Sequence, residues 1–291
     1  MKPKAYDLFC GLGGWTEGLL AEDYDVTGYD IEAHEYESTC NKCDGTGNFY
    51  RNDEDGDRLN CDCYIDYDQY GKVIQKYPAT LVLRDVLSIH GSEFKDAALI
   101  VASPPCQEYS YMAMPFSRGK AIAKALRGQG EFPEGYTGSR TIEQLNALFN
   151  ACFRIQREAS EAAGRHVPMV VENVRGAQPW VGKAKANFGS FYLWGDVPAL
   201  MPYVYKCKCS NEFSADLGKY GCPNCNSENG AAIKQPGLSG AAWFDRGAAA
   251  LSSKSTARKA ASAQIAKIPF ALSSHIARAY KPATWEAKNE R

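Results

Sequence analysis

The chain has 291 residues, of which 45% are hydrophobic, and its 33 basic and 34 acidic residues leave a formal net charge of −1. That length predicts one large globular domain plus a small second one, with a core that needs no external staples. No apolar stretch approaches the roughly 18 residues of a membrane span, and the first residues, MKPKAYDLFCGLGG, do not follow a signal-peptide pattern. We therefore expect a cytoplasmic protein, in a bacterial or phage-infected cell, that has no membrane partner.

The N-terminal segment KAYDLFCGLGGWTEGLLAEDYDVTGYDIE predicts a β-α-β unit. A short strand breaks at Gly11, Gly13 and Gly14, a helix starts at Trp15, and a second strand ends at Asp30. In a glycine turn between a strand and a helix, a ligand can approach the bare backbone, and the helix N–H groups face it. A carboxylate at Asp30 can accept hydrogen bonds from both hydroxyls of a ribose.

Three further buried strands follow along the chain. The runs PATLVLRDVLSI, DAALIVASPPC and HVPMVVENV are rich in β-branched or aliphatic residues and do not alternate with polar ones, as expected for strands covered on both faces. The first ends near Asp85 and the third on the polar pair Glu172 and Asn173. Strands that alternate with helices predict an α/β fold with a doubly wound, mostly parallel Rossmann-like sheet, whose site lies at the carboxyl ends of the strands.

One long helix is predicted over residues 141–164. Its apolar residues repeat at helical spacing, Thr141 and Gln144 match a capping box, and Gly164 marks the end. Cys152 falls within the apolar stripe, so we interpret it as a core residue.

The spacing of the glycine turn does not suit a phosphate cradle. It has no GK[ST] sequence, and a pyrophosphate-binding GxGxxG would need a further glycine. A cofactor made of adenosine plus an amino acid fits better, with Asp30 at the ribose and Asp85 at the adenine amino group. Either aspartate taken singly can instead cap a helix or a turn.

The motifs DLFCGLGGWTEGL, SPPCQEYS and VVENV resemble, in the same order, the AdoMet-binding, catalytic and target-base motifs of the DNA cytosine-5 methyltransferase family. RTIEQLNALFNACFRI resembles the family helix between the last two motifs, and AQIAKIPFALSSHIARAY resembles the C-terminal motif that returns to pack beside the first. The resemblance covers residues 1–35, 80–110, 140–176 and 260–282. It implies S-adenosyl-L-methionine as cofactor and double-stranded DNA as partner. It also implies cofactor contacts at Phe9, Gly11, Gly13, Gly14, Asp30, Glu32, Asp85 and Val86, and catalytic roles for Cys106 and Glu172.

The chemistry that the resemblance implies requires those residue types. Cytosine C5 is a poor nucleophile, so the Cys106 thiolate first adds to C6, and the resulting enamine attacks the methyl group of the sulfonium. Glu172 stabilises the ring by donating a proton or hydrogen bond at N3 and by holding the exocyclic amine, which requires a carboxyl with a raised pKa. Loss of the C5 proton and β-elimination of Cys106 end the reaction, and the base must be flipped out of the duplex to reach the pocket.

Two departures from the family pattern keep other functions open. Ser103-Pro104-Pro105 stands where the family usually has Gly-Phe-Pro, and it resembles the motif of methyltransferases that act on cytosine N4 and carry an aromatic residue in place of Cys106. No Gln-x-Arg-x-Arg stretch is apparent, and Arg246 or Arg258 are the candidates for its arginine. The alternatives are cytosine-5 methylation of RNA or of a free pyrimidine nucleotide, cytosine-N4 methylation, and a non-catalytic zinc-containing DNA-binding protein.

Eight of the eleven cysteines form two quartets of close pairs, the pattern of a tetrahedral structural zinc site. Disulfides or unliganded thiols are the alternatives. The first quartet lies in an acidic insertion at about residues 38–72 and resembles the CxxCxGxG knuckle of DnaJ-type zinc domains, whereas the second lies where the family places its target-recognition region. The quartets are Cys40, Cys43, Cys61 and Cys63, and Cys207, Cys209, Cys222 and Cys225.

The expected organisation is an AdoMet-binding catalytic domain over residues 1–185, a small target-recognition lobe over 186–258, and a C-terminal segment over 259–291 that returns to the catalytic domain. We expect a monomer. The segment from Arg246 to Trp285 carries no acidic residue, which favours a polyanionic partner, although a solvated basic face is an alternative. A second basic stretch after Cys106 suits a mobile loop closing over phosphates, or a plain surface loop, and contains Arg118, Lys120, Lys124 and Arg127.

Overall fold

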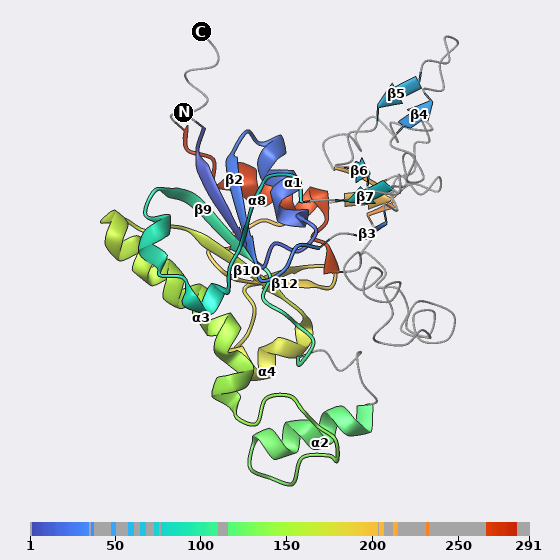
Figure 1. Cartoon of the computed structure of the whole chain (residues 1–291), viewed down its shortest axis with the longest axis vertical. Coiled ribbons are helices and arrows are strands. Elements are labelled where there is room, and N and C mark those ends of the chain that lie inside the picture. Colours follow the sequence, from blue (N-terminus) through green and yellow to red (C-terminus); the bar gives the residue numbers. More distant parts are fainter. Residues whose placement is uncertain are drawn as a thin grey trace.

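The computed structural model describes residues 2–34, 77–109, 116–202 and 266–283, together with the backbone of short strand segments between these ranges. A seven-stranded sheet forms its centre (Figure 1). Its strands are β1 (Lys4–Leu8), β2 (Asp25–Asp30), β8 (Thr80–Leu83), β9 (Ala97–Ala102), β10 (Met169–Asn173), β11 (Ala186–Phe188) and β12 (Phe191–Gly195).

The strand order is β11-β12-β10-β9-β1-β2-β8. Neighbouring strands from β10 through β8 pair in parallel, and β12 runs antiparallel to both β10 and β11. The prediction of an α/β fold with a mostly parallel sheet is therefore confirmed. From β1 the chain moves outward through β2 to β8 and then returns to β9 on the other side, so the order reverses between β1 and β9. Such a reversal is where open α/β sheets bind ligands, outside the carboxyl ends of the strands.

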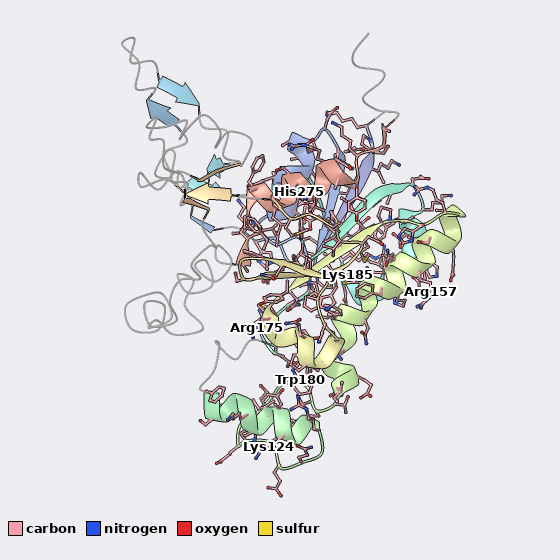
Figure 2. All side chains as sticks on the ribbon, turned by 180° about the vertical axis from the view of Figure 1, so that it is seen from behind. Lys124, Arg157, Arg175, Trp180, Lys185 and His275 are labelled. Carbon is pink, nitrogen blue, oxygen red and sulfur yellow. The ribbon has the colours of Figure 1, made fainter. Side chains whose placement is uncertain are left out.

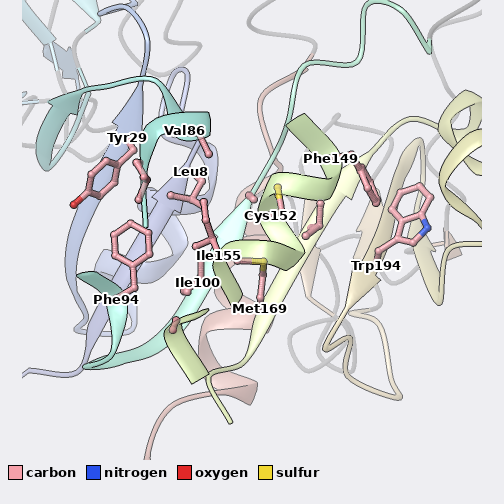
Figure 3. Close-up of a cluster of buried hydrophobic side chains, with 14 of the residues drawn as sticks. Leu8, Tyr29, Val86, Phe94, Ile100, Phe149, Cys152, Ile155, Met169 and Trp194 are labelled. Atoms are coloured by element: carbon pink, nitrogen blue, oxygen red, sulfur yellow. The ribbon is translucent and has the colours of Figure 1, made fainter. Parts of the chain in front are cut away.

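Helices cover both faces of the sheet. The described helices are α1 (Gly14–Ala21), α2 (Phe116–Leu126), α3 (Ile142–Ala163), α4 (Gln178–Val181) and α8 (Phe270–Ala279), with 3₁₀ turns η1 (Val86–Ser88), η2 (Gly91–Phe94) and η4 (Arg175–Ala177). Helix α2 lies away from the sheet (Figure 1). The face under α3 carries the core of Figure 3, in which Ile155 and Cys152 of the helix pack with Ile100 and Met169 of the strands. Burial of this apolar stripe is what fixes α3 on the sheet.

The helix predicted over residues 141–164 is α3. The Thr141 hydroxyl accepts from the Gln144 N–H at 3.1 Å, the Gln144 side chain accepts from the Thr141 N–H at 3.3 Å, and Gly164 ends the helix with a φ of 63°. The capping box and the glycine stop are therefore confirmed. Cys152 is fully buried, as its place in the apolar stripe predicted.

The opposite face of the sheet is covered by α1 and α8, which come from opposite ends of the described sequence (Figure 1). A Cβ added at Gly14 would lie 2.5 Å from the Ile268 backbone nitrogen, so the missing side chain is what lets the two segments meet. The Tyr24 hydroxyl donates to the Ala277 carbonyl at 2.9 Å, and Lys267 pairs with Glu17 at 2.6 Å. The C-terminal segment thus packs beside the first motif.

The remaining strands either extend the main sheet or form small sheets of their own. Strands β11 and β12 extend the main sheet past residue 185, so that part of the chain belongs to the same sheet as the first domain. The remaining strands form small separate sheets: β3 (Tyr36–Glu37), β6 (Ile65–Tyr67) and β7 (Val73–Gln75); β4 (Asn48–Tyr50) and β5 (Arg58–Asn60); β13 (Val204–Lys206), β14 (Glu212–Ser214) and β15 (Ala231–Ala232). Within the described ranges, no helix has the length and apolar character needed to cross a membrane.

Candidate active site at the carboxyl edge of the sheet

The turn between β1 and α1 has an unusual backbone. Phe9, Gly11 and Gly13 all have positive φ, at 57°, 51° and 76°. Phe9 is strained there, because an L side chain rarely adopts this region, and such strain gathers at functional sites. A Cβ added at Gly11 would meet no atom within 4 Å, so the turn is open at that residue. The backbone is therefore bare where a ligand would approach.

Asp30 lies beside this turn, at the end of β2. Its Oδ2 accepts from the Gly11 N–H at 2.9 Å and its Oδ1 from the Ile31 N–H at 2.8 Å, while His34 Nε2 lies 3.5 Å from Oδ1. Burial acts to raise the pKa of Asp30, but the hydrogen bonds from His34, Gly11 and Ile31 outweigh it and hold the pKa below its usual value. Asp30 is therefore ionised. Among the described contacts, its Oδ2 accepts only from the Gly11 N–H, which leaves an acceptor position on this oxygen for a hydroxyl donor.

The other predicted cofactor residues are arranged less favourably. Asp85 is exposed after β8, and its Oδ1 accepts from the Leu87 N–H at 2.9 Å, so it caps η1 as an ordinary turn residue does. Val86 is buried beneath it, and Glu32 is exposed with an oxygen 3.8 Å from His34 Nδ1. The strands do bring Asp85 close to Asp30, since the Arg84 N–H donates to the Asp30 carbonyl at 2.7 Å.

Cys106 follows β9 on the other side of the strand-order reversal and is half-buried. Burial raises its pKa to about 11, and the negative charge of Glu172 acts in the same direction. Cys106 is therefore a thiol at neutral pH. The other free cysteines of the described chain, Cys10 and Cys152, are buried, so Cys106 is the accessible one of the three.

Glu172 lies in β10, next to β9, the strand that precedes Cys106. Val171 pairs with Ala102 in the parallel register, which places Glu172 beside Ser103. Burial raises the pKa of Glu172 to about 8, and a hydrogen bond from the Ser103 side chain acts against this rise. The carboxyl is therefore protonated at neutral pH, as the chemistry implied by the resemblance requires.

Hydrogen bonds hold the segment between β9 and Cys106 onto β10. The buried Asn173 side chain donates to the Pro104 carbonyl at 2.9 Å and accepts from the Val174 N–H at 2.8 Å. The Tyr109 N–H donates to the Cys106 carbonyl at 3.0 Å, and the Tyr109 hydroxyl lies 2.9 Å from the Asn146 amide oxygen. Hydrogen bonds before and after Cys106 therefore fix the backbone that carries its thiol beside the strand of Glu172.

Two contacts of this edge escaped sequence reasoning. The Trp15 indole N–H donates to the Ser103 hydroxyl at 3.0 Å, and the Thr16 hydroxyl donates to the buried Asp7 carboxyl at 2.7 Å. Burial raises the pKa of Asp7 to about 7. The sequence singled out Ser103 because it departs from the family motif, but no local pattern indicated that Trp15 is its hydrogen-bond partner.

The basic stretch after Cys106 forms α2 and the loop that follows it. Figure 2 shows Lys124 on α2, at the end of the molecule away from His275 of α8. The Arg127 guanidinium stacks over the Trp180 ring at 4.4 Å, and Arg118 donates to the Glu134 carbonyl at 3.2 Å. Lys120 lies 4.6 Å from the centre of the Phe116 ring. Closure of this segment over phosphates stays a prediction.

The two cysteine quartets, Arg246 and Arg258 all lie outside the described residues. Inside the described ranges, no group of three or more histidine, cysteine, aspartate and glutamate side chains could hold a metal ion. The predicted zinc sites and the predicted replacement for the missing arginine motif stay predictions.

Comparison with known proteins gives likeness in structure alone. No family model and no curated protein matches the chain. The similar solved structures are methyltransferases. They include a Dnmt2 methyltransferase of S. pombe, with 13% identity over 62% of this chain and 37% of that one, at a TM-score of 0.29. A putative DNA modification methyltransferase encoded within an E. coli prophage has 16% identity over 60% and 33%, at 0.29, and the methyltransferase EhMeth of Entamoeba histolytica has 13% over 62% and 41%, at 0.31. This chain thus spans about two fifths or less of each of these proteins.

Proposed function

We propose that this protein is an AdoMet-dependent DNA cytosine-5 methyltransferase. The observation that carries the proposal is the pairing of an accessible thiol, Cys106, with a buried and protonated carboxyl, Glu172, across two neighbouring strand ends. Addition to the cytosine ring needs a nucleophile and a proton or hydrogen-bond donor on the same base.

The residues of the β1–α1 turn fit the cofactor. Asp30 would accept from the ribose hydroxyls, because it is ionised and beside the open backbone at Gly11. When bound, AdoMet supplies the electrophilic methyl group. The turn and Asp30 lie on one side of the β1/β9 reversal, and Cys106 lies on the other, so a base held at Cys106 would face the cofactor.

The chain's own residues divide the work on the base. The Cys106 sulfur attacks C6, and Glu172 donates its proton or a hydrogen bond to N3, which takes up the charge that addition places on the ring. A protonated Glu172 also removes the negative charge that opposes formation of the Cys106 thiolate. Once C5 carries the methyl group that AdoMet would supply, water accepts the C5 proton and the ring electrons expel the Cys106 sulfur as a thiolate. N3 returns to Glu172 any proton that it took, which restores the aromatic ring and both side chains.

Double-stranded DNA is the proposed substrate, with the target base flipped out of the stack, since the ring cannot be reached inside a duplex. The cations of α2 and its loop support a polyanionic partner, because salt-sensitive contacts to phosphates supply most of the non-specific affinity for DNA. The second cysteine quartet would hold a zinc ribbon for target recognition, and the first a zinc knuckle in the insertion.

One experiment separates this function from its rivals. The protein is incubated with labelled AdoMet and, in parallel, with duplex DNA, transfer RNA and dCMP, and the methylated nucleoside is identified. We expect 5-methylcytosine in the duplex, and a loss of at least about 10³-fold in turnover for Cys106→Ala, since the nucleophile is gone. Cys152→Ala, which removes a core thiol, is the matched control and should keep its turnover.

Each rival predicts a different result. Methylation of transfer RNA alone, or of dCMP alone, would show that the substrate is RNA or a free nucleotide and not DNA. Formation of N4-methylcytosine, or full activity of Cys106→Ala, would refute the thiolate mechanism. The absence of any transfer would favour a binding protein. For zinc, metal analysis should find about two ions per chain, and a metal-free protein that is stably folded would contradict both sites.

A further inference from the structure

Ser103 stands at the strand-order reversal, between the two halves of the site. Its backbone N–H donates to the Leu8 carbonyl at 3.1 Å, which ties the end of β9 to the end of β1. Its hydroxyl accepts from the indole N–H of Trp15 at 3.0 Å, across 88 positions of sequence. Trp15 is the second residue of α1 and is 2% exposed, so the donor is held in place by the core.

The direction of this hydrogen bond is determined by chemistry. An indole nitrogen is a donor only, so the Ser103 oxygen must be the acceptor. A hydroxyl has one hydrogen of its own, and that hydrogen is then left to point at another acceptor. Glu172 lies beside Ser103 in the strand register, so its carboxyl is the neighbouring acceptor for this hydrogen.

We propose that Ser103 is a positioning residue that links helix α1 to the Glu172 carboxyl: the Trp15 N–H orients the Ser103 hydroxyl, and the hydroxyl donates to Glu172. The inference rests on the proposed function, because it assigns a role to Ser103 through Glu172. It accounts for the serine at this point of the chain. A glycine there would leave the indole N–H and the carboxyl without this partner, in a place where burial makes an unmade hydrogen bond costly.

Among the strand neighbours of Glu172 that the structure describes, Ser103 is the polar one. On β12, the residue opposite Glu172 is Leu193, and on β9 the residue before Ser103 is Ala102, both apolar. The titratable group that faces Glu172 is Cys106, which follows Ser103 on the same segment. The hydrogen bond from Ser103 favours the ionised form of Glu172 and so opposes the rise in pKa that burial causes. It thereby keeps the pKa of Glu172 near neutral pH.

The test compares Ser103→Ala with Ser103→Thr, which keeps a hydroxyl, and with Trp15→Phe, which keeps an aromatic ring and loses the N–H. The titration of Glu172 is followed by infrared spectroscopy on the full chain without cofactor. The protonated carboxyl band is assigned by its loss in Glu172→Gln. We expect the Glu172 midpoint to rise by about one pH unit in Ser103→Ala, by less in Trp15→Phe, and to stay near the wild-type value in Ser103→Thr.

Kinetics supply the second readout. In Ser103→Ala we expect kcat for methyl transfer at pH 7 to fall by about tenfold, with the KM for AdoMet unchanged, and Ser103→Thr to restore most of kcat. Unchanged titration of Glu172 in both Ser103→Ala and Trp15→Phe would overturn the proposal. So would a loss confined to the KM for AdoMet, which would mark a structural role. If Ser103→Ala does not fold, the titration in Trp15→Phe decides alone.

Failure of the proposed function would look different. A wild-type protein that methylates no cytosine would refute that function, while the infrared titration would still decide whether Ser103 links Trp15 to Glu172.

Discussion

Two carboxyl groups lie on opposite sides of the β1/β9 reversal, and they differ in protonation although both residues are buried. Asp30 and Glu172 are each 8% exposed. Asp30 accepts from the backbone N–H groups of Gly11, Ile31 and Glu32 and lies beside His34, and these contacts keep it ionised. At Glu172 the Ser103 side chain opposes the effect of burial without outweighing it, and the carboxyl keeps its proton. Burial acts to raise both pKa values; the donors around Asp30 outweigh it, whereas the Ser103 side chain does not outweigh it at Glu172, so the two carboxyls differ in charge.

The difference separates two chemical tasks within one crevice. An ionised acceptor suits the fixed hydroxyl groups of a cofactor, and a neutral carboxyl suits a base that becomes charged during the reaction. A pair of carboxyls whose environments push their pKa values apart is typical of such a division. Substitutions at Glu172 and at Asp30 should therefore have separable effects on catalysis and on cofactor binding.

Glu172→Gln should have the largest effect on the catalytic side. Removing the proton donor should lower kcat for cytosine methylation by about 10²–10⁴-fold, the usual contribution of a positioned acid. AdoMet affinity should not change, because Asp30 is untouched. Glu158→Gln is the matched control, since Glu158 accepts from the Gly91 N–H at 2.7 Å beside η2 and takes no part in the site. A tenfold loss of AdoMet affinity in Glu172→Gln would contradict the division.

Asp30→Ala should weaken AdoMet binding and leave the chemical step nearly unchanged. Loss of an ionised acceptor for the ribose hydroxyls should raise the KM for AdoMet by about 10- to 100-fold, with kcat at saturating cofactor nearly unchanged. Titration calorimetry with AdoMet gives the same quantity without turnover. Asp85→Ala should have a smaller effect, because the Asp85 side chain is engaged in capping η1. Equal effects of the two substitutions would show that the cap and the ribose acceptor have been assigned wrongly.

The pH dependence of kcat should report the catalytic side alone. The reacting pair is a Cys106 thiolate with a protonated Glu172, whose pKa values are about 11 and about 8. Below about pH 8, kcat should rise roughly tenfold per unit as the thiolate forms, and above it the loss of the Glu172 proton should cancel further gain.

A profile that is flat at neutral pH and falls above pH 8 would mean that Cys106 is already ionised, against the effect of its burial. In Glu172→Gln the break near pH 8 should vanish. AdoMet affinity, measured by calorimetry over the same range, should stay constant because Asp30 is ionised throughout.

Much of this arrangement follows from local sequence. The strand that precedes Cys106 and the strand that carries Glu172 near its end contain continuous apolar runs, and the parallel order of such strands brings their ends to one edge. The ends of α3 were predictable because Thr141 and Gln144 interact across a single turn of helix. The position of Cys106 after β9 was predictable for the same reason.

The rest depends on contacts that no local pattern encodes. Ser103 and Trp15 are 88 residues apart, and they meet because the sheet places β9 beside β1. The opposite charge states of Asp30 and Glu172 depend on which N–H groups reach each carboxyl, and this is a property of the folded backbone. Asp85 also follows a strand, as Asp30 ends one, but its side chain caps η1, so the residue type and its place in the sequence do not determine its role.

Asp7, a third buried carboxyl, gives the smallest prediction and the only one about stability. It is fully buried in β1, and its Oδ1 has no hydrogen-bond partner among the described residues, while its Oδ2 accepts from Thr16. Burial raises its pKa to about 7; the Thr16 hydrogen bond opposes the rise and the charge of Asp30 adds to it. Folded Asp7 therefore holds a proton that the unfolded chain releases at lower pH.

The sign of the effect follows from this difference. Stability from Asp7 is complete below the pKa of an unfolded aspartate and is lost as pH rises toward about 7, with a slope of at most about 1.4 kcal/mol per pH unit. Glu172 adds a loss of the same sign up to about pH 8. Urea unfolding at several pH values should show Asp7→Asn flattening the lower part of this decline, and Glu172→Gln the upper part. Thr16→Val should extend the decline to higher pH, because it removes the hydrogen bond that lowers the pKa of Asp7. A slope that is the same in Asp7→Asn as in the wild type would mean that Asp7 is ionised in the fold, and that burial does not hold a proton on this carboxyl as it does on Glu172.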